Sequence, residues 1–357
     1  MIVANNFIFG RFSGTLTTTL VGSALPSGGE KYIGGVLAPN GKIYFSPTIS
    51  VTQILEFNPT TLVNTLVGSV LSGATYKYVG GVLAPNGKIY FTPLEALQVL
   101  ELNPSTLITT LVGSSLSSGY KYIGGVLAPN GKIYSAPYDA TQILEFNPTT
   151  LVNTLVGSVL SGGGKYIGGV LAPNGKIYFT PHNASQILEL DPSTLITTLV
   201  GSVLFSQNQK YSGGVLAPNG KIYFTPFQAS QILEFNPTTL MTTLVGSVLS
   251  GTGRYDGGVL APNGKIYFVT SSATQVLEFN PITLTTTLVG SIFRGASKYA
   301  GGVLAPNGKI YFTPRTEDNV LELSNVNSPN VLGIDSLIPS DLTTLATSNY
   351  NKYYNKY

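Results

Sequence analysis

Few side chains in this sequence of 357 residues could carry out acid–base or metal chemistry. The chain has no cysteine and a single histidine, His182, which excludes thiol catalysis and thiolate zinc sites and makes histidine-based triads hard to build. It contains neither a Gly-x-Ser-x-Gly elbow nor a glycine motif for nucleotide binding. Among the acids outside the repeated pattern, the candidates for such chemistry are Glu95, Asp139, Asp256, Glu317 and Asp318. We therefore predict a protein that is not an enzyme, with no catalytic residue, cofactor or metal.

The composition narrows the class of protein further. Only 10% of residues are charged, against roughly 25% in an ordinary globular chain. With 43% hydrophobic residues the chain is too apolar to be disordered, yet no apolar run approaches the ~20 residues of a membrane span. A net charge of +3 is too small to indicate nucleic-acid binding. Because no secretory signal is visible at the N-terminus, we expect a cytoplasmic or virion-associated protein.

An internal repeat dominates the chain and predicts its architecture. The string Gly-Gly-Val-Leu-Ala-Pro-Asn-Gly-Lys-Ile-Tyr occurs seven times, and each copy follows the last by 44 to 46 residues. The copies begin at Gly34, Gly80, Gly124, Gly168, Gly213, Gly257 and Gly301. A period near 45 without a helical pattern is the length of one four-stranded propeller blade.

Each repeat divides into four short strands. In the first repeat we expect them at residues 32–39, 42–47, 53–58 and 62–68, with Asn40-Gly41 forming a type I′ hairpin turn. The second and third strands are apolar on both faces, as expected for a blade between two neighbours. The fourth alternates Thr and Asn with Leu and Val and should be the outer strand. The glycine pair should let the first strands crowd around the axis.

The two ends of the repeat region predict how the ring closes. A copy of the fourth strand, residues 16–23, precedes the first repeat, whereas the last repeat ends at residue 323 without one. The N-terminal strand should therefore complete the last blade and leave no free edge at the joint. We predict an all-β, seven-bladed propeller domain over residues 1–323 and a non-repeated extension over residues 324–357.

The order Gly-Val-Leu-Ala-Pro-Asn-Gly-Lys-Ile-Tyr, Gln-Ile-Leu-Glu-Phe-Asn-Pro and Thr-Leu-Val-Gly-Ser resembles the NHL and YVTN class of β-propeller repeats over residues 15–323. The resemblance implies a fold and not an activity. Members of that class mostly bind proteins, RNA or glycans, and a few related propellers are metal-dependent lactonases or lyases.

The seven repeats differ mainly on one face of the expected wheel. The turns after the first and third strands are nearly constant and share one face, whereas the other loops vary and share the opposite face. We call these the constant face and the variable face. Variable-face residues that we expect to bind a ligand are Leu94, Glu95, Tyr138, Asp139, His182, Asn183, Phe227, Gln228, Arg315 and Glu317. Their variation indicates a recognition surface or neutral drift in exposed loops. We expect the non-repeated acids to lie far from the axis.

The repeated charges form two sets. The lysine of each Asn-Gly-Lys turn and the glutamate of the third strand should pair across strands, as Lys42 and Glu56 would. The second set stands before the tyrosine that opens each first strand: Lys31, Lys77, Lys121, Lys165, Lys210, Arg254 and Lys298. We expect it to ring the variable face, either as a basic rim that attracts phosphate, uronate or sialate groups or as a solvated edge.

These observations support one leading hypothesis for the function. It is a non-enzymatic binding or structural module that recognises a protein or a surface glycan, as a surface or attachment component of a virion or phage particle. The C-terminal tyrosines form either a docking anchor or a frayed tail: Tyr350, Tyr353, Tyr354 and Tyr357. The alternatives are an intracellular protein–protein scaffold and, less favoured, a metal-dependent lactonase-like hydrolase.

Overall fold

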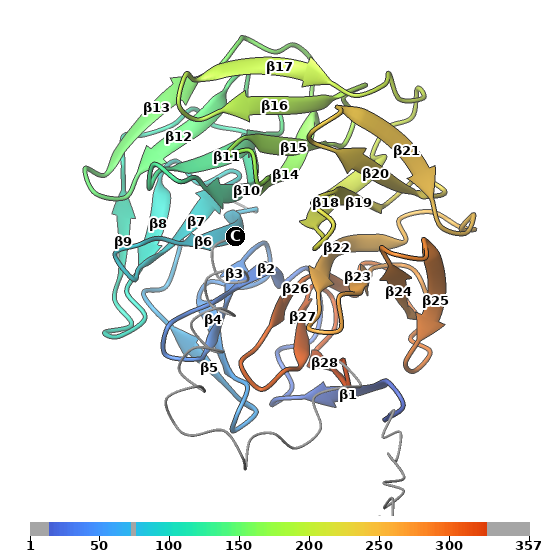
Figure 1. Cartoon of the computed structure of the whole chain (residues 1–357). Helices are drawn as coiled ribbons and strands as arrows, with labels where there is room; N and C mark the ends of the chain where they lie inside the picture. Colours follow the sequence, from blue (N-terminus) through green and yellow to red (C-terminus); the bar gives the residue numbers. More distant parts are fainter. Residues whose placement is uncertain (1–13, 73–75, 327–357) are drawn as a thin grey trace, which may run out of the picture.

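The computed structural model describes residues 14–72 and 76–326, which form seven four-stranded antiparallel sheets arranged around a central axis (Figure 1). The predicted seven-bladed β-propeller is confirmed. No helix forms within these ranges, and so none that could span a membrane.

The strands follow one another from the axis outwards in each blade, and we number the blades in chain order. The innermost strands are β2 (Tyr32–Leu37), β6 (Tyr78–Leu83), β10 (Tyr122–Leu127), β14 (Tyr166–Leu171), β18 (Tyr211–Leu216), β22 (Tyr255–Leu260) and β26 (Tyr299–Leu304). The second strands are β3 (Ile43–Pro47), β7 (Ile89–Pro93), β11 (Ile133–Pro137), β15 (Ile177–Pro181), β19 (Ile222–Pro226), β23 (Ile266–Thr270) and β27 (Ile310–Pro314).

The third strands are β4 (Ile54–Asn58), β8 (Val99–Leu102), β12 (Ile143–Asn147), β16 (Ile187–Asp191), β20 (Ile232–Asn236), β24 (Val276–Asn280) and β28 (Val320–Ser324). The outer strands are β5 (Val63–Val67), β9 (Thr109–Val112), β13 (Val152–Val156), β17 (Ile196–Val200), β21 (Met241–Val245), β25 (Thr285–Val289) and, in blade 7, β1 (Thr17–Val21). The second and third strands are buried almost throughout, as predicted, because each blade is covered on both faces.

The ring closes through the N-terminal strand. Strand β1 pairs antiparallel with β28, from Thr17 opposite Ser324 to Val21 opposite Val320. The first described strand and the last therefore lie in one sheet, which confirms the predicted closure (Figure 1).

The first glycine of each repeat sets the distance between inner strands. A Cβ atom added to Gly34 would lie 2.9 Å from the Cα atom of Gly80, and one added to Gly301 would lie 3.1 Å from the Cα atom of Gly34. The φ angle of Gly34 is +79°, a left-handed conformation that favours glycine. The glycines therefore let neighbouring backbones touch around the axis.

The hairpin turn between the first two strands is not of type I′. Type I′ needs positive φ at both central residues, and in the first repeat only Gly41 has it, at +77°. The Gly41 N–H donates to the Ala38 carbonyl over 2.9 Å, and the Ala38 N–H donates to the Lys42 carbonyl over 2.9 Å. The loop is thus three residues long, because Pro39 fixes a negative φ that suits a type I turn followed by a left-handed glycine.

The predicted lysine–glutamate pairs form in every blade, over 2.6 to 2.8 Å. In blade 1 the Tyr44 hydroxyl also donates to Glu56 over 2.8 Å, and the Asn40 amide donates to that hydroxyl over 2.9 Å. The same amide reaches the Pro104 carbonyl of blade 2. A partly buried network of polar side chains therefore links the hairpin turn, the blade core and the next blade on the constant face. Since the lysines are about one-third exposed, each ion pair itself stabilises the fold by only ~0.2–1 kcal/mol.

We predict that Gly124→Ala destabilises the propeller more than Gly131→Ala. Both glycines have positive φ, so each alanine costs about 1–2 kcal/mol of backbone strain. Only at residue 124 would the added Cβ meet backbone, 3.0 Å from the Gly168 Cα, whereas no atom lies within 4 Å at residue 131. The free energy of unfolding in urea should fall by about 1–3 kcal/mol more for Gly124→Ala. Equal losses would contradict this role of the inner glycines.

Candidate functional site

In six of the seven blades, the loop between the second and third strands begins with a residue whose backbone is held on both sides. In blade 3 the Tyr138 N–H donates to the Lys121 carbonyl over 2.9 Å, and its carbonyl accepts from the Lys165 N–H over 2.8 Å. Equivalent bonds hold this position in five other blades, so a constant backbone carries a changing side chain. We call these positions the loop ring: Thr48, Leu94, Tyr138, His182, Phe227, Ser271 and Arg315.

The side chains of the loop ring differ in how deeply they are buried. Tyr138, Phe227 and Arg315 are partly exposed, whereas the other four side chains are buried. Leu94 and His182 were expected to contact a ligand, but both lie beneath the surface and cannot do so directly. They lie where the apolar core extends into the loops.

Three charged residues from distant parts of the sequence meet at the inner end of the loops. Arg315 donates to Glu30 over 2.8 Å through Nη2 and to Asp256 over 3.3 Å through Nη1. The Ser212 hydroxyl donates to the other oxygen of Asp256 over 2.6 Å. Burial opposes the charge of Arg315, but the carboxylates of Asp256 and Glu30 outweigh it and raise the pKa of the guanidinium. The three charges thus hold one another between blades 6, 7 and 1.

Tyrosines lie beside this charged group. The rings of Tyr76 and Tyr120 are 5.5 Å apart between centroids. Burial, followed by the Glu30 carboxylate, raises the pKa of Tyr76, and burial together with Glu95 raises that of Tyr120. Both hydroxyls therefore stay protonated at neutral pH and can donate hydrogen bonds.

An aromatic arc continues from there across blades 3 to 5. The ring of His182 lies 6.0 Å from that of Tyr138 and 6.2 Å from that of Phe227. Nδ1 of His182 is 3.0 Å from the Tyr211 carbonyl, which can only accept, so Nδ1 carries the proton. Burial lowers the pKa of His182, and the neutral imidazole serves as a spacer between two partly exposed rings.

The second variable residues of these loops mainly position neighbouring loops. Asp139 accepts from the Gly164 N–H over 2.7 Å, and Asn183 accepts from the Gln209 N–H over 2.8 Å. The Gln228 N–H donates to the Gln209 carbonyl over 3.0 Å. Glu95 and Glu317 are partly exposed. Much of the predicted recognition set therefore builds the surface, while part of it remains accessible.

The seven repeated basic residues do not form an exposed rim. Their exposed fractions are 0 to 7%, and their side chains donate to loop carbonyls. Lys77, for example, donates to the Thr48 carbonyl of blade 1 over 3.0 Å, and Arg254 donates to the Ala229 carbonyl of blade 5 over 2.7 Å. The expectation of an anion-attracting rim was wrong, because these charges are used to satisfy buried carbonyls between blades.

Four residues of this site were not among the predicted ligand-binding residues: Glu30, Tyr76, Tyr120 and Asp256, the last of which had been noted only as a non-repeated acid. Asp256 is on the inner strand β22, so the expectation that the non-repeated acids lie far from the axis was wrong for it. The sequence feature that could have identified Asp256 is its departure from the repeat. The other blades have an uncharged residue at that position: Ile33, Val79, Ile123, Ile167, Ser212 and Ala300. We call the accessible and charged group the mouth cluster: Glu30, Tyr76, Tyr120, Tyr138, Phe227, Asp256 and Arg315.

The mouth cluster has no arrangement typical of a metal centre. Across the described ranges, no three Asp, Glu or His side chains come together in a way that could hold an ion. The C-terminal tyrosines predicted as an anchor lie outside the described residues.

Comparisons with known proteins identify the fold. No protein-family model matches the chain, and no curated protein matches it. A structure described as a streptogramin B lyase aligns with a TM-score of 0.72 and 15% identity, covering 87% of this chain and 97% of that chain. A catalytically inactive histidine-to-alanine variant of virginiamycin B lyase from Staphylococcus aureus, with quinupristin, aligns with a TM-score of 0.72 and 14% identity, covering 87% and 99%.

A more distant neighbour is an extracellular domain of a two-component system from B. thetaiotaomicron, with a TM-score of 0.61 and 11% identity, covering 84% of this chain and 40% of that one. At these identities the likeness concerns the fold alone. The chain is a seven-bladed β-propeller, consistent with the NHL and YVTN type of repeat.

We predict that Lys121 gives the propeller a measurable pH dependence of stability. Burial lowers the pKa of Lys121 to about 8, whereas an unfolded chain would titrate near about 10.4. Between these values the unfolded state binds more protons, so the free energy of unfolding should rise with pH. Urea unfolding at about pH 7.5, 8.5 and 9.5 should show a smaller rise for Lys121→Met than for Lys132→Met, its control on the constant face. The same rise in both variants would disprove the assignment.

Proposed function

We propose that this propeller is a non-enzymatic recognition module that binds a glycan or a protein at the mouth cluster. The observation that carries the proposal is the convergence of unlike side chains at one end of an otherwise repeated wheel. Glu30, Asp256 and Arg315 come from positions far apart in the sequence, yet they form one hydrogen-bonded group beside Tyr76, whose ring contacts that of Tyr120.

The chemistry of the mouth cluster suits a saccharide in particular. Tyr120 is 40% exposed, and Tyr138 and Phe227 present part of their rings, so that flat apolar surfaces are available for stacking. The carboxylates of Glu30 and Asp256 and the guanidinium of Arg315, each still partly exposed, add acceptors and donors for hydroxyl groups. The loop ring holds Tyr138, Phe227 and Arg315 on a fixed backbone, which lowers the entropy cost of binding.

Two facts favour binding over catalysis. The single histidine is buried, and its Nδ1 donates to a backbone carbonyl. The carboxylates of Glu30 and Asp256 are both committed to Arg315. These groups are arranged to neutralise one another and not to transfer protons. The lyase activity named for two structural neighbours is therefore not part of this proposal.

A more specific form of the proposal is a surface or attachment component of a virion or phage particle. The low charge of the chain and its threonine-rich outer strands support this form. A protein ligand inside a cell is the alternative source of the same recognition chemistry.

The proposal predicts a saturable ligand that depends on the exposed rings. Purified wild-type protein should bind a subset of a broad glycan array at two ionic strengths, about 0.05 and 0.5 M. The double variant Tyr120→Ser/Phe227→Ser should lose affinity by about tenfold or more, since ~1.4 kcal/mol of lost stacking corresponds to a factor of ten. His182 and Leu94 stay unchanged, because their replacement would disturb the core.

Ile282→Ser provides the control for this experiment. Ile282 is 88% exposed in a turn of the constant face, so its replacement should leave binding unchanged. Binding that survives in the double variant would exclude the mouth cluster as the site. Absence of any glycan ligand would reject the saccharide form and leave a protein ligand to be tested.

A further inference from the structure

The hairpin turns of the constant face carry an asparagine followed by glycine in all seven blades. The asparagines are Asn40, Asn86, Asn130, Asn174, Asn219, Asn263 and Asn307. Because glycine has no Cβ atom, its backbone nitrogen is unhindered and can attack the Cγ atom of the asparagine before it. The flanking sequence Val-Leu-Ala-Pro-Asn-Gly-Lys-Ile-Tyr is identical in every blade. The intrinsic reactivity of the seven turns is therefore equal, and only the fold can make one of them differ.

The attack converts the asparagine side chain in two steps. First the glycine nitrogen bonds to Cγ and closes a cyclic succinimide, while the side-chain nitrogen leaves as ammonia and takes the glycine N–H proton with it. Water then opens the ring to give aspartate or isoaspartate. One water is consumed, one ammonia is released, and nothing is oxidised or reduced. Since the amide nitrogen is the leaving group, hydrogen bonds that hold this nitrogen in place oppose the reaction.

Three hydrogen bonds restrain all seven turns to the same extent. In blade 1 the Asn40 amide donates to the Tyr44 hydroxyl over 2.9 Å, and the Lys42 N–H donates to Oδ1 of Asn40 over 3.1 Å. The Gly41 N–H donates to the Ala38 carbonyl over 2.9 Å. The equivalent bonds in the other blades differ from these lengths by at most 0.1 Å.

A fourth bond is present in only six of the seven turns. The Asn40 amide also donates to the Pro104 carbonyl of blade 2, and equivalent bonds of 3.2 to 3.5 Å link five other turns to the next blade. Within the described ranges, the amide of Asn263 in blade 6 reaches no such carbonyl. The acceptor belongs to the turn that joins the third strand to the outer strand. Blade 7 has no such turn, because its outer strand is the N-terminal β1.

From these observations we infer that Asn263 is a site of spontaneous covalent modification, which is converted to aspartate and isoaspartate faster than the other six asparagines. Its side chain is partly buried, whereas those of the other six are exposed. Burial does not prevent the first step, because ring closure is intramolecular and water enters only afterwards. The closure of the wheel by a strand from the opposite end of the chain thus leaves one turn less restrained. This inference is independent of the ligand of the mouth cluster.

Conversion of Asn263 would weaken the polar network of blade 6. The Asn263 amide donates to the Tyr267 hydroxyl over 2.8 Å, and this hydroxyl donates its own hydrogen to Glu278 over 2.9 Å. A carboxylate at residue 263 can only accept hydrogen bonds, so the tyrosine oxygen would lose its donor. It would also place a second negative charge beside the hydroxyl that Glu278 already uses. The modified protein should therefore be less stable than the original one.

Peptide mapping of the incubated full chain tests the inference. After storage of the native protein in mildly alkaline buffer, trypsin releases one peptide per turn, and mass spectrometry detects the acid that replaces the amide. The blade 6 peptide, residues 255–265, is distinguished by Asp256, whereas residues 32–42, 122–132 and 166–176 have one shared sequence and give one average. Conversion at Asn263 should be about two- to tenfold faster than in every other turn peptide, the change expected from one lost neutral hydrogen bond.

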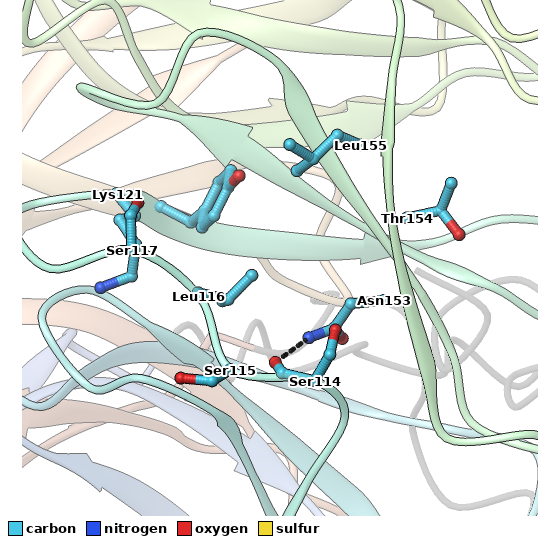
Figure 2. Close-up of a pocket in the computed structure, with 9 residues that line it drawn as sticks. Ser114, Ser115, Leu116, Ser117, Lys121, Asn153, Thr154 and Leu155 are labelled. Atoms are coloured by element: carbon cyan, nitrogen blue, oxygen red, sulfur yellow. Dashed lines mark hydrogen bonds between the residues drawn. The ribbon is translucent and has the colours of Figure 1, made fainter.

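Two controls separate the fold from the sequence. In protein unfolded with guanidinium chloride, all seven turns should convert at the same rate. Asn153 also donates an inter-blade bond, to the Ser114 carbonyl over 2.9 Å, beside a cavity of about 300 Å³ between blades 2 and 3 (Figure 2). Thr154 follows it, and a β-branched residue hinders attack by its own nitrogen, so Asn153 should remain unconverted.

Three results would each overturn the inference. They are conversion of native Asn263 no faster than in the other turns, an excess at Asn263 that persists in the unfolded protein, and conversion of Asn153 at the rate of Asn263.

Discussion

The approach of one glycine to the next around the axis is the constraint on which this wheel depends. Each inner strand crosses its neighbour with backbone against backbone, and Gly301 meets Gly34 just as Gly34 meets Gly80. A side chain at any of these positions would push two neighbouring inner strands apart. Because the seven strands form a closed ring, such a widening could not be absorbed at a free end. Closure therefore fixes the blade angle, and with it the places where loops from different blades can meet. The pairing of β1 with β28 then joins the ring where the first and last described strands meet.

Repetition decides which residues are available for a specific site. A residue that recurs in every blade occupies seven equivalent positions around the axis. Such a residue suits a structural role, because each blade needs the same support. The buried lysines show this, because each uses its ammonium group to satisfy carbonyls of adjacent loops. A site with one orientation needs residues that break the pattern. Arg315, Glu30 and Asp256 break it in three neighbouring blades, and the fixed loop backbones bring them into contact.

Most elements that could be predicted from sequence were those determined within one repeat. Strand order, the buried second and third strands and the Lys42–Glu56 type of pair follow from local pattern and register. Ring closure followed instead from the strand copies at the two ends of the repeat region. The turn at Asn40 was wrongly assigned because Pro39 outweighs the Asn-Gly signal. The burial of Lys77 and the contact of Arg315 with Glu30 depend on neighbouring blades, which a single repeat does not describe. For Arg315 and Glu30 the separation is 285 residues along the chain.

The mouth cluster and the outer strands differ in how closely they follow the sequence repeat. At the mouth cluster, departures from the repeat in individual loops place one unlike group on a symmetric frame, which is the arrangement that the proposed ligand would need to bind once and in one orientation. On the outer strands the blades repeat the same uncharged pattern, and one leucine of each strand is about half exposed. Seven such strands present the same surface around the circumference, so no one of them marks a unique position on the wheel. The residues that do mark one lie in the loops, where the repeat leaves the side chain free to differ while the backbone stays fixed.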